Sequence, residues 1–168
     1  AVSGFQFHRQ AYPMRYGNAS ASIMDVQVKR GSTRKLDGGF GLGLGTFQGN
    51  ISFPVLEGKS SLMLNGRFSN VGLVSNILKE VSDDLNFSFG FNDGMAKYHH
   101  RLDSVNTLEA LYFRAEDWAT KNTGLASNSA RIRRPFRTTH QLAGLKWLHQ
   151  GDQWLGETKI FASQYRNQ

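Results

Sequence analysis

The chain has 168 residues, of which 39% are hydrophobic, with 18 glycines, 12 phenylalanines, no cysteine and a net charge of +7. This length suffices for one domain with a sizeable core, and many glycines with only three prolines suit an all-β protein. No run approaches the roughly 18 apolar residues of a membrane helix, and the first residues lack the basic and apolar regions of a signal peptide. Because lysine and arginine are spread along the chain, we do not expect nucleic acid as a partner.

The beginning of the chain differs in pattern from the rest. Alternating stretches at 5–8 and 20–29 predict two strands, and a polar linker follows at 31–35. The sequence therefore predicts two domains, 1–36 and 37–168.

Residues 38–70 predict three consecutive antiparallel strands. Apolar residues alternate with glycines at 40–44, and after Gly45-Thr46 they move from even to odd positions. A chain reversal explains this shift, as a β-bulge also would. A second reversal is predicted at 57–59. Such a meander needs a closed sheet or a partner to cover its edges.

Beyond residue 70 the predicted connections alternate between long and short. The predicted elements are a connection at 71–84 with one helical turn at 74–81, a strand at 85–102 with a bulge at Asp93-Gly94, a turn at 103–106, a strand at 107–118, a polar loop at 119–135, a strand at 136–149, a turn at 150–153 and a strand at 154–166.

This rhythm is typical of an outer-membrane barrel, which has tight periplasmic turns and long outer loops. The predicted strands are long, about 12 to 18 residues, whereas roughly 9 to 11 cross a bilayer. Trp118, Trp147 and Trp154 lie near the predicted strand ends, where an aromatic girdle falls. We count seven barrel strands, but a single-chain bacterial barrel has an even number of at least eight. We therefore expect an all-β fold, an antiparallel meander forming part of a transmembrane β-barrel that belongs to a longer chain or closes with another chain.

Residues 12–20, followed by 23–31, resemble the end of the plug domain of TonB-dependent outer-membrane receptors. In that family a Tyr-Gly-small turn leads into an apolar strand that ends in Lys and Gly. The barrel of the family opens with a Gly-rich strand and a short Gly-Ser/Thr-aromatic loop, which residues 45–47 match. Arg67-Phe68 match an arginine before the apolar end of a later strand. The chain is most similar to receptors of the Bacteroidetes group.

The resemblance implies a segment of an energy-coupled importer in the bacterial outer membrane, preceded by the end of a plug. It implies that the TonB box, most of the plug and about two-thirds of a barrel of about 22 strands are missing. The implied solute is bulky and scarce, such as an iron chelate, cobalamin or a glycan, and no resident cofactor is expected. The implied partners are outer-membrane lipid or lipopolysaccharide, the TonB complex through the missing N-terminal region, and a surface lipoprotein.

The predicted site residues belong to two groups. The resemblance implies structural roles in the plug for Arg15, Tyr16, Gly17 and Asn18, and strand alternation in a barrel predicts lumen-facing positions for Asn65, Arg67, Asn86 and Ser88.

The sequence shows no catalytic constellation. His99 and His100 are adjacent and face opposite sides of a strand, and no nucleophile elbow is present. The glycines at 39–43 follow strand alternation and not the pattern of a phosphate loop. We therefore expect neither an enzyme nor a metal site. The arginines at 131–137 suit a solvated loop or a contact with lipopolysaccharide or another anionic ligand.

Two other functions remain open from the sequence. One is a small ligand-binding or lipid-binding β-barrel that is not a transporter. The other is an outer-membrane enzyme, which the absence of a catalytic constellation disfavours.

Overall fold

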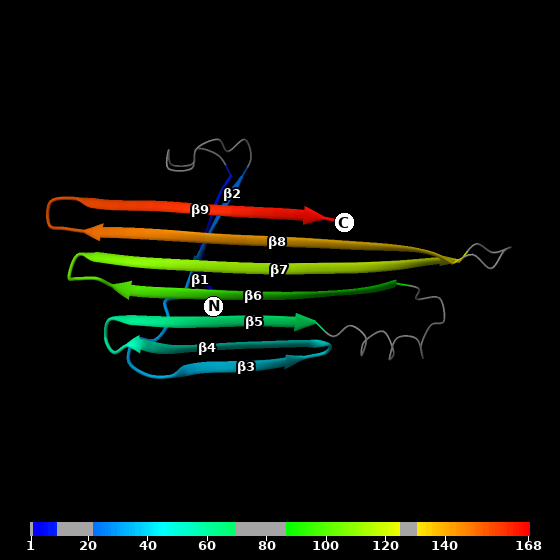
Figure 1. Ribbon diagram of the computed structural model, residues 1–168, viewed down its shortest axis with the longest axis horizontal. Coiled ribbons are helices and arrows are strands. Elements are labelled where there is room, and N and C mark those ends of the chain that lie inside the picture. The colour runs from blue at the N-terminus through cyan, green and yellow to red at the C-terminus, as the bar shows by residue number, and fades with distance from the viewer. Residues whose placement is uncertain (1, 10–21, 70–86, 125–130) are drawn as a thin grey trace. The chain divides into compact units, whose positions relative to one another are not determined.

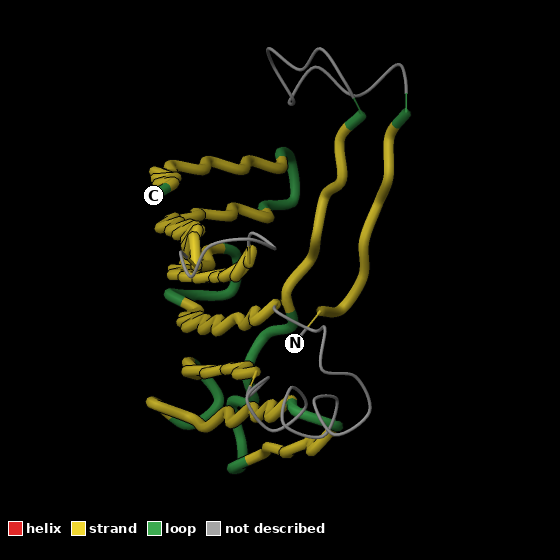
Figure 2. Tube along the Cα trace, turned by 90° about the vertical axis from the view of Figure 1, so that its right-hand side faces the viewer, coloured by secondary structure: helices red, strands yellow, loops and turns green. Residues whose placement is uncertain are grey.

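The computed structural model describes residues 2–9, 22–69, 87–124 and 131–168, and all of its regular elements are β-strands. The strands are β1 (Val2–His8), β2 (Ile23–Val28), β3 (Asp37–Gly43), β4 (Thr46–Leu56), β5 (Ser60–Ser69), β6 (Phe87–Arg101), β7 (Asn106–Gly124), β8 (Arg131–Gln150) and β9 (Leu155–Asn167). Figure 2 shows only strands and loops over these residues. The predicted all-β fold is confirmed.

The contacts divide the chain into two units, Ala1–Arg30 and Gly31–Gln168. In the first unit, β1 and β2 form an antiparallel pair with one register irregularity between Val2 and Gly4. In the second unit, seven antiparallel strands follow one another in the order of the chain, from β3 to β9 (Figure 1). The meander that the sequence predicts, with seven strands, is therefore present.

The first two hairpins turn where the sequence predicts reversals. Gly45 has φ of 74° in the turn between β3 and β4, and Gly58 has φ of 68° between β4 and β5. β3 and β4 pair without a register shift, so a reversal and not a bulge accounts for the change of phase. A bulge lies instead between Pro54 and Leu56, beside a proline that lacks a ladder donor.

We predict that Gly58→Ala lowers the free energy of unfolding by about 1 to 2 kcal/mol, because a Cβ disfavours the left-handed region. No atom lies within 4 Å of the position of the new Cβ, so the cost is conformational and not steric. Gly49→Ala is the matched control, since the nearest atom there is a carbonyl oxygen at 4.0 Å and φ is not positive. Urea unfolding of both variants measures the difference, and equal costs would contradict the assignment.

The bulge predicted at Asp93-Gly94 is wrong. β6 pairs with β5 and with β7 in unbroken registers through these residues. One face of β6 carries Phe89 and Phe91 in its first half and Lys97 in its second half. The change of pattern therefore reflects a change of side-chain type along one face and not a shift of the backbone.

The polar loop predicted at 119–135 is also largely wrong. β7 continues to Gly124 and β8 begins at Arg131, with Thr120 paired to Pro135 in the ladder. Polar residues on both faces remove the alternation of apolar and polar residues from which a strand is predicted. As a result β7 and β8 have 19 and 20 residues, and Trp118 lies well inside β7 instead of near its end.

β3, β4 and β5 have 7, 11 and 10 residues and fit between the predicted reversals. They fall below the general strand length of about 12 to 18 residues that the sequence suggests. The predicted helical turn at 74–81 and the middle of the predicted polar loop lie outside the described residues.

The predicted turn between β6 and β7 is confirmed, and a carboxylate organises it. Asp103 Oδ1 accepts hydrogen bonds from the backbone N–H groups of Val105 (2.8 Å) and Asn106 (2.7 Å), and Asp103 Oδ2 accepts one from Asn106 Nδ2 (2.8 Å). The side-chain bond from Asn106, followed by the two backbone bonds, lowers the pKa of Asp103 below its ordinary value of 3.8. The contribution of this carboxylate to stability is therefore present above that value and lost as the pH falls through the lowered pKa.

Candidate functional site

The seven-stranded sheet, from β3 to β9, has two faces that differ in side-chain chemistry. The strand register shows which residues belong to each face. On one face, here called the apolar face, two adjacent rows of paired residues cross the sheet from β4 to β9. The first row is Phe53, Leu62, Tyr98, Ala110, Leu145 and Ile160, and the second is Ile51, Leu64, Ala96, Tyr112, Ala143 and Ala162. Since successive residues of a strand point to opposite faces, the residues between these belong to the other face. We call it the polar face because it carries the ion pairs described below, although it also holds apolar side chains such as Leu111, Phe113 and Phe161.

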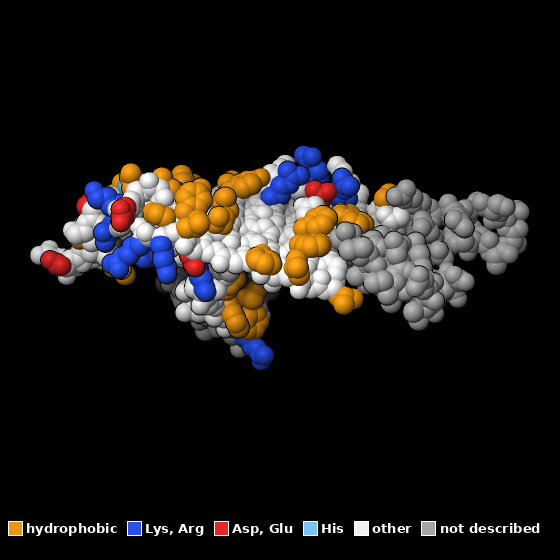
Figure 3. Space-filling model, turned by 90° about the horizontal axis from the view of Figure 1, so that it is seen from below, with side chains coloured by type: hydrophobic (Ala, Val, Ile, Leu, Met, Phe, Trp, Pro, Cys, Tyr) orange, Lys and Arg blue, Asp and Glu red, His pale blue; other side chains and the backbone are white. Residues whose placement is uncertain are grey.

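The apolar side chains of this sheet do not form a core. Leu64, Leu145 and Ile160 are 40%, 53% and 68% exposed, and Met63 is the one buried apolar side chain among the described residues. Figure 3 shows hydrophobic side chains at the surface along the sheet. An exposed apolar surface of this extent marks contact with another protein or with a membrane.

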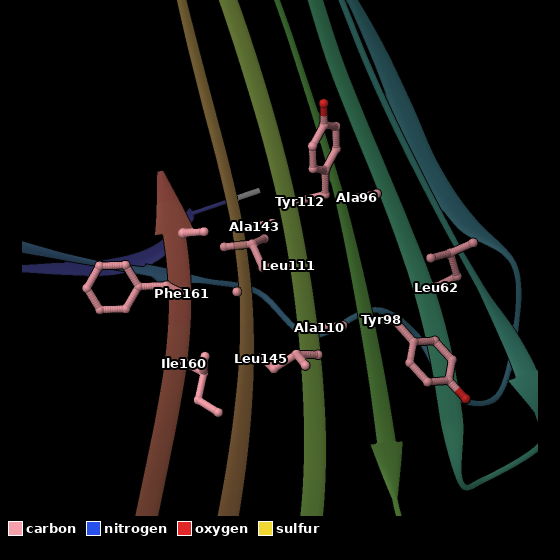
Figure 4. A pocket seen from close by; sticks show the side chains of 12 residues that line it. Leu62, Ala96, Tyr98, Ala110, Leu111, Tyr112, Ala143, Leu145, Ile160 and Phe161 are labelled. Carbon is pink, nitrogen blue, oxygen red and sulfur yellow. The ribbon is translucent and has the colours of Figure 1, made fainter. Parts of the chain in front are cut away.

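The apolar face contains a shallow groove of about 480 Å³ across β5–β9. Its floor is made of small residues, among them Ala96, Ala110 and Ala143, and larger side chains such as Tyr112 and Leu145 stand beside them (Figure 4). The floor is low because three adjacent strands place alanine in the two rows.

Aromatic rings gather on the apolar face next to the tight turns. Trp147 Nε1 donates a hydrogen bond to Asn106 Oδ1 (3.1 Å), and His149 Nδ1 lies 2.9 Å from the same oxygen. The rings of His149 and Trp154 stack with centroids 3.9 Å apart. Amphipathic rings of this kind favour the boundary between an apolar and an aqueous phase.

Arginines border the apolar rows on the side away from these turns. Glu116 forms ion pairs with Arg137 (Nε–Oε1, 3.3 Å) and Arg114 (Nη2–Oε2, 3.6 Å). These contacts show that the three side chains project from the same face. In the backbone ladder, Arg166 lies opposite Thr139 and Thr139 lies opposite Glu116. Arg166 therefore belongs to this face too. We call Arg114, Arg137, Arg166 and Glu116 the arginine patch.

The polar face carries two clusters of ion pairs. Glu109 lies 3.2 Å from Lys97 Nζ and 3.4 Å from His99 Nδ1, and these side chains are only about a tenth exposed. Glu157 binds Lys146 at 2.8 Å and Lys159 at 2.7 Å, where it is more open to solvent. The two clusters lie on one row of the sheet, since Glu109 lies opposite Lys146 in the backbone ladder and Lys146 lies opposite Lys159.

Two of the predicted lumen-facing residues lie on the polar face. Arg67 Nε donates to Asp93 Oδ2 at 2.8 Å, its guanidinium lies 4.6 Å from the centroid of the Phe91 ring, and Asn65 belongs to the same face. Ser88 pairs with Thr120 in the backbone ladder, and its side chain is outside the described part.

The remaining predicted residues, Arg15, Tyr16, Gly17, Asn18 and Asn86, lie outside the described residues. Their roles, like the lumen-facing roles of Asn65, Arg67 and Ser88, remain predictions. His99 and His100 lie on opposite faces, as expected. The part of the chain that the structure describes holds no cluster of three His, Asp or Glu side chains placed to hold a metal ion.

Sequence reasoning singled out Arg137 among the arginines at 131–137 but missed the rest of the arginine patch and both ion-pair clusters. Glu116 and Asp117 are adjacent on β7 and belong to opposite faces, so only Glu116 joins the arginine patch. The available signal was opposite charge at positions that pair across a hairpin, as Glu109 and Lys146 do, but using it requires the register.

Comparison with family models, with curated proteins and with solved structures gave no match. Over the described residues, the structure contains no helix with the length and apolar character needed to cross a membrane.

Proposed function

We propose that the chain is a segment of a TonB-dependent outer-membrane receptor, in which residues 37–168 are the first strands of the barrel and residues 1–36 the end of the plug. The observation that carries this proposal is the two-faced seven-stranded meander. Its apolar face suits the hydrocarbon of a bilayer. Its polar face, which holds both ion-pair clusters beside apolar side chains such as Phe113, is the face that we assign to a water-filled lumen.

The height of the apolar rows supports a membrane. On β5 the apolar residues run from Leu62 to Phe68, which is about 20 Å at 3.4 Å per residue, whereas on β7 they run from Leu108 to Tyr112, about 14 Å. The lipid-facing band of an outer-membrane barrel is about 25 Å tall. The aromatic cluster borders the rows at one end, and the arginine patch borders them at the other, which fits an apolar band between two polar interfaces.

The path of the apolar residues supports tilted strands. Leu64 on β5 lies in the same row as Tyr112 on β7 and Ala143 on β8. On β5 the apolar residues continue beyond this row to Phe68, whereas on β7 the next residue on the face is Arg114. An apolar band that crosses a sheet obliquely fits strands that are inclined to a flat bilayer, and barrel strands are inclined by roughly 35 to 45°.

The import function and the solute classes rest on the sequence resemblance. In this proposal a bulky solute, such as an iron chelate, cobalamin or a glycan, is captured by the outer loops and passes the barrel when the plug moves. The TonB complex supplies the energy, and a surface lipoprotein is a candidate partner.

The test is the intact mass of the natural polypeptide together with its extraction from membranes. We expect a mass several times the 18.8 kDa of this chain and release from the membrane by detergent but not by salt or carbonate. A stable polypeptide of 18.8 kDa that is soluble without detergent would contradict the proposal.

That contrary result would favour a small ligand-binding β-barrel. The observation that points to it is the groove of about 480 Å³, a volume within the range of small-molecule sites. In that case the groove would face a closed interior and not lipid.

A further inference from the structure

We propose that the groove and the arginine patch together form one binding site for an anionic lipid. An acyl chain lies on the alanine floor of the groove, and the phosphate of the headgroup contacts Arg114 and Arg137. This inference rests on the proposed membrane location. It adds a binding site for one class of lipid to a face that otherwise makes only non-specific contact with the lipids of the bilayer.

The groove provides the place for the acyl chain. Tyr98, Tyr112 and Leu145 rise above the floor formed by Ala96, Ala110 and Ala143, and all of them are lining residues (Figure 4). A uniformly apolar lipid face needs no such depression. A step between large and small side chains holds a linear hydrocarbon by shape, because its atoms then have contacts on the sides as well as below.

The arginine patch provides the place for the phosphate. The side chains of Arg114 and Arg137 are 51% and 60% exposed, although each pairs with Glu116. One carboxylate cannot use the five N–H donors of each guanidinium, so donors remain for a further anion. With Arg166 included, the patch has three cationic side chains and one anionic side chain, so an anion is attracted.

The two parts of the site are continuous. Tyr112, which lines the groove, and Arg114 are two residues apart on β7 and share a face. At 3.4 Å per residue their Cα atoms are about 7 Å apart along the strand. A lipid has the same arrangement, since its anionic headgroup adjoins its acyl chains. A free anion would leave the groove without an occupant, and a neutral lipid would leave the arginines without one.

The test measures which lipid the protein retains. The natural polypeptide is purified in a nonionic detergent, mixed with equal amounts of phosphatidylglycerol and phosphatidylcholine, and examined by native mass spectrometry. We expect phosphatidylglycerol to be retained preferentially. Arg114→Gln combined with Arg137→Gln is expected to reduce that preference about 5-fold for each arginine removed.

Arg67→Gln is the matched control, because it removes a half-exposed arginine from the opposite face. It is expected to leave the preference unchanged. Ala110→Leu with Ala143→Leu fills the groove, adds apolar surface to the same face, and is expected to reduce retention of both lipids. Equal retention by the wild type and the Arg114/Arg137 variant, or an equal loss in Arg67→Gln, would overturn the site.

Excess inorganic phosphate distinguishes a lipid from a free anion. Displacement of the lipid by inorganic phosphate, with no effect of the groove-filling substitutions, would show a simple anion site and overturn the lipid assignment. Extraction of each variant is measured in parallel. Variants that still need detergent but show no preference overturn this inference alone, whereas wild-type protein that is soluble without detergent overturns the proposed function.

Discussion

With the proposed membrane location, Leu64→Arg is expected to lower the free energy of unfolding by about 2 to 4 kcal/mol, the cost of a lipid-facing arginine near the midplane of a bilayer. Leu64 lies in the second apolar row, between Ile51 and Ala96, and it is 40% exposed. An exposed arginine on a solvated sheet would cost little. The substitution therefore separates a lipid-facing surface from a solvated one.

Asn65→Arg is the control for this substitution. Asn65 is the next residue on β5 and belongs to the polar face, so the same arginine is placed in an aqueous environment. We expect a change within about 0.5 kcal/mol. Urea unfolding in vesicles and the amount of folded protein in the outer membrane measure both variants. Equal effects at 64 and 65 would contradict the assignment of the faces.

The second large effect is expected at the buried ion pairs of the polar face. Glu109→Gln is expected to cost about 3 kcal/mol, because it removes the negative charge beside Lys97 and His99 in a place where little water reaches. The glutamine keeps the size and some hydrogen-bonding capacity of the side chain, so the loss reports mainly on charge. Urea unfolding at pH 8, followed by tryptophan fluorescence, measures it.

Asp93→Asn provides the comparison for Glu109→Gln. Asp93 pairs with Arg67, whose side chain is 51% exposed, and water screens such a pair. We expect a cost below about 1 kcal/mol. If the two substitutions cost the same, the surroundings of Glu109 are not as dry as its exposure indicates.

The hairpins show how much of the fold was available from local sequence. Reversals at 45–46 and 57–59 follow from glycines and from a change of phase in the apolar pattern, and both are present. The polar ends of β7 and β8 were not predictable in the same way, because Thr, Asn and Arg on both faces leave no alternation to read. The false bulge at Asp93-Gly94 has another origin, because one face of β6 changes from Phe89 and Phe91 to Lys97 while the register stays unbroken.

The candidate site was less predictable than the fold. Asn65 and Arg67 were selected because they alternate with apolar residues on one strand, a property that sequence displays directly. The arginines at 131–137 point to Arg137, but the arginine patch joins residues of β7, β8 and β9, and no local pattern places Arg137 beside Arg114, Glu116 and Arg166.

The sequence by itself determined that this chain forms antiparallel strands joined by tight turns, since alternation and turn glycines act over a few neighbouring residues. Only the tertiary structure decided which residues meet across strands. A shift of the register by one residue would move Arg137 to the other face and away from Glu116. Register is set by the sum of pairings along whole ladders, so the groove, the arginine patch and the buried ion pairs appear only when the sheet is assembled.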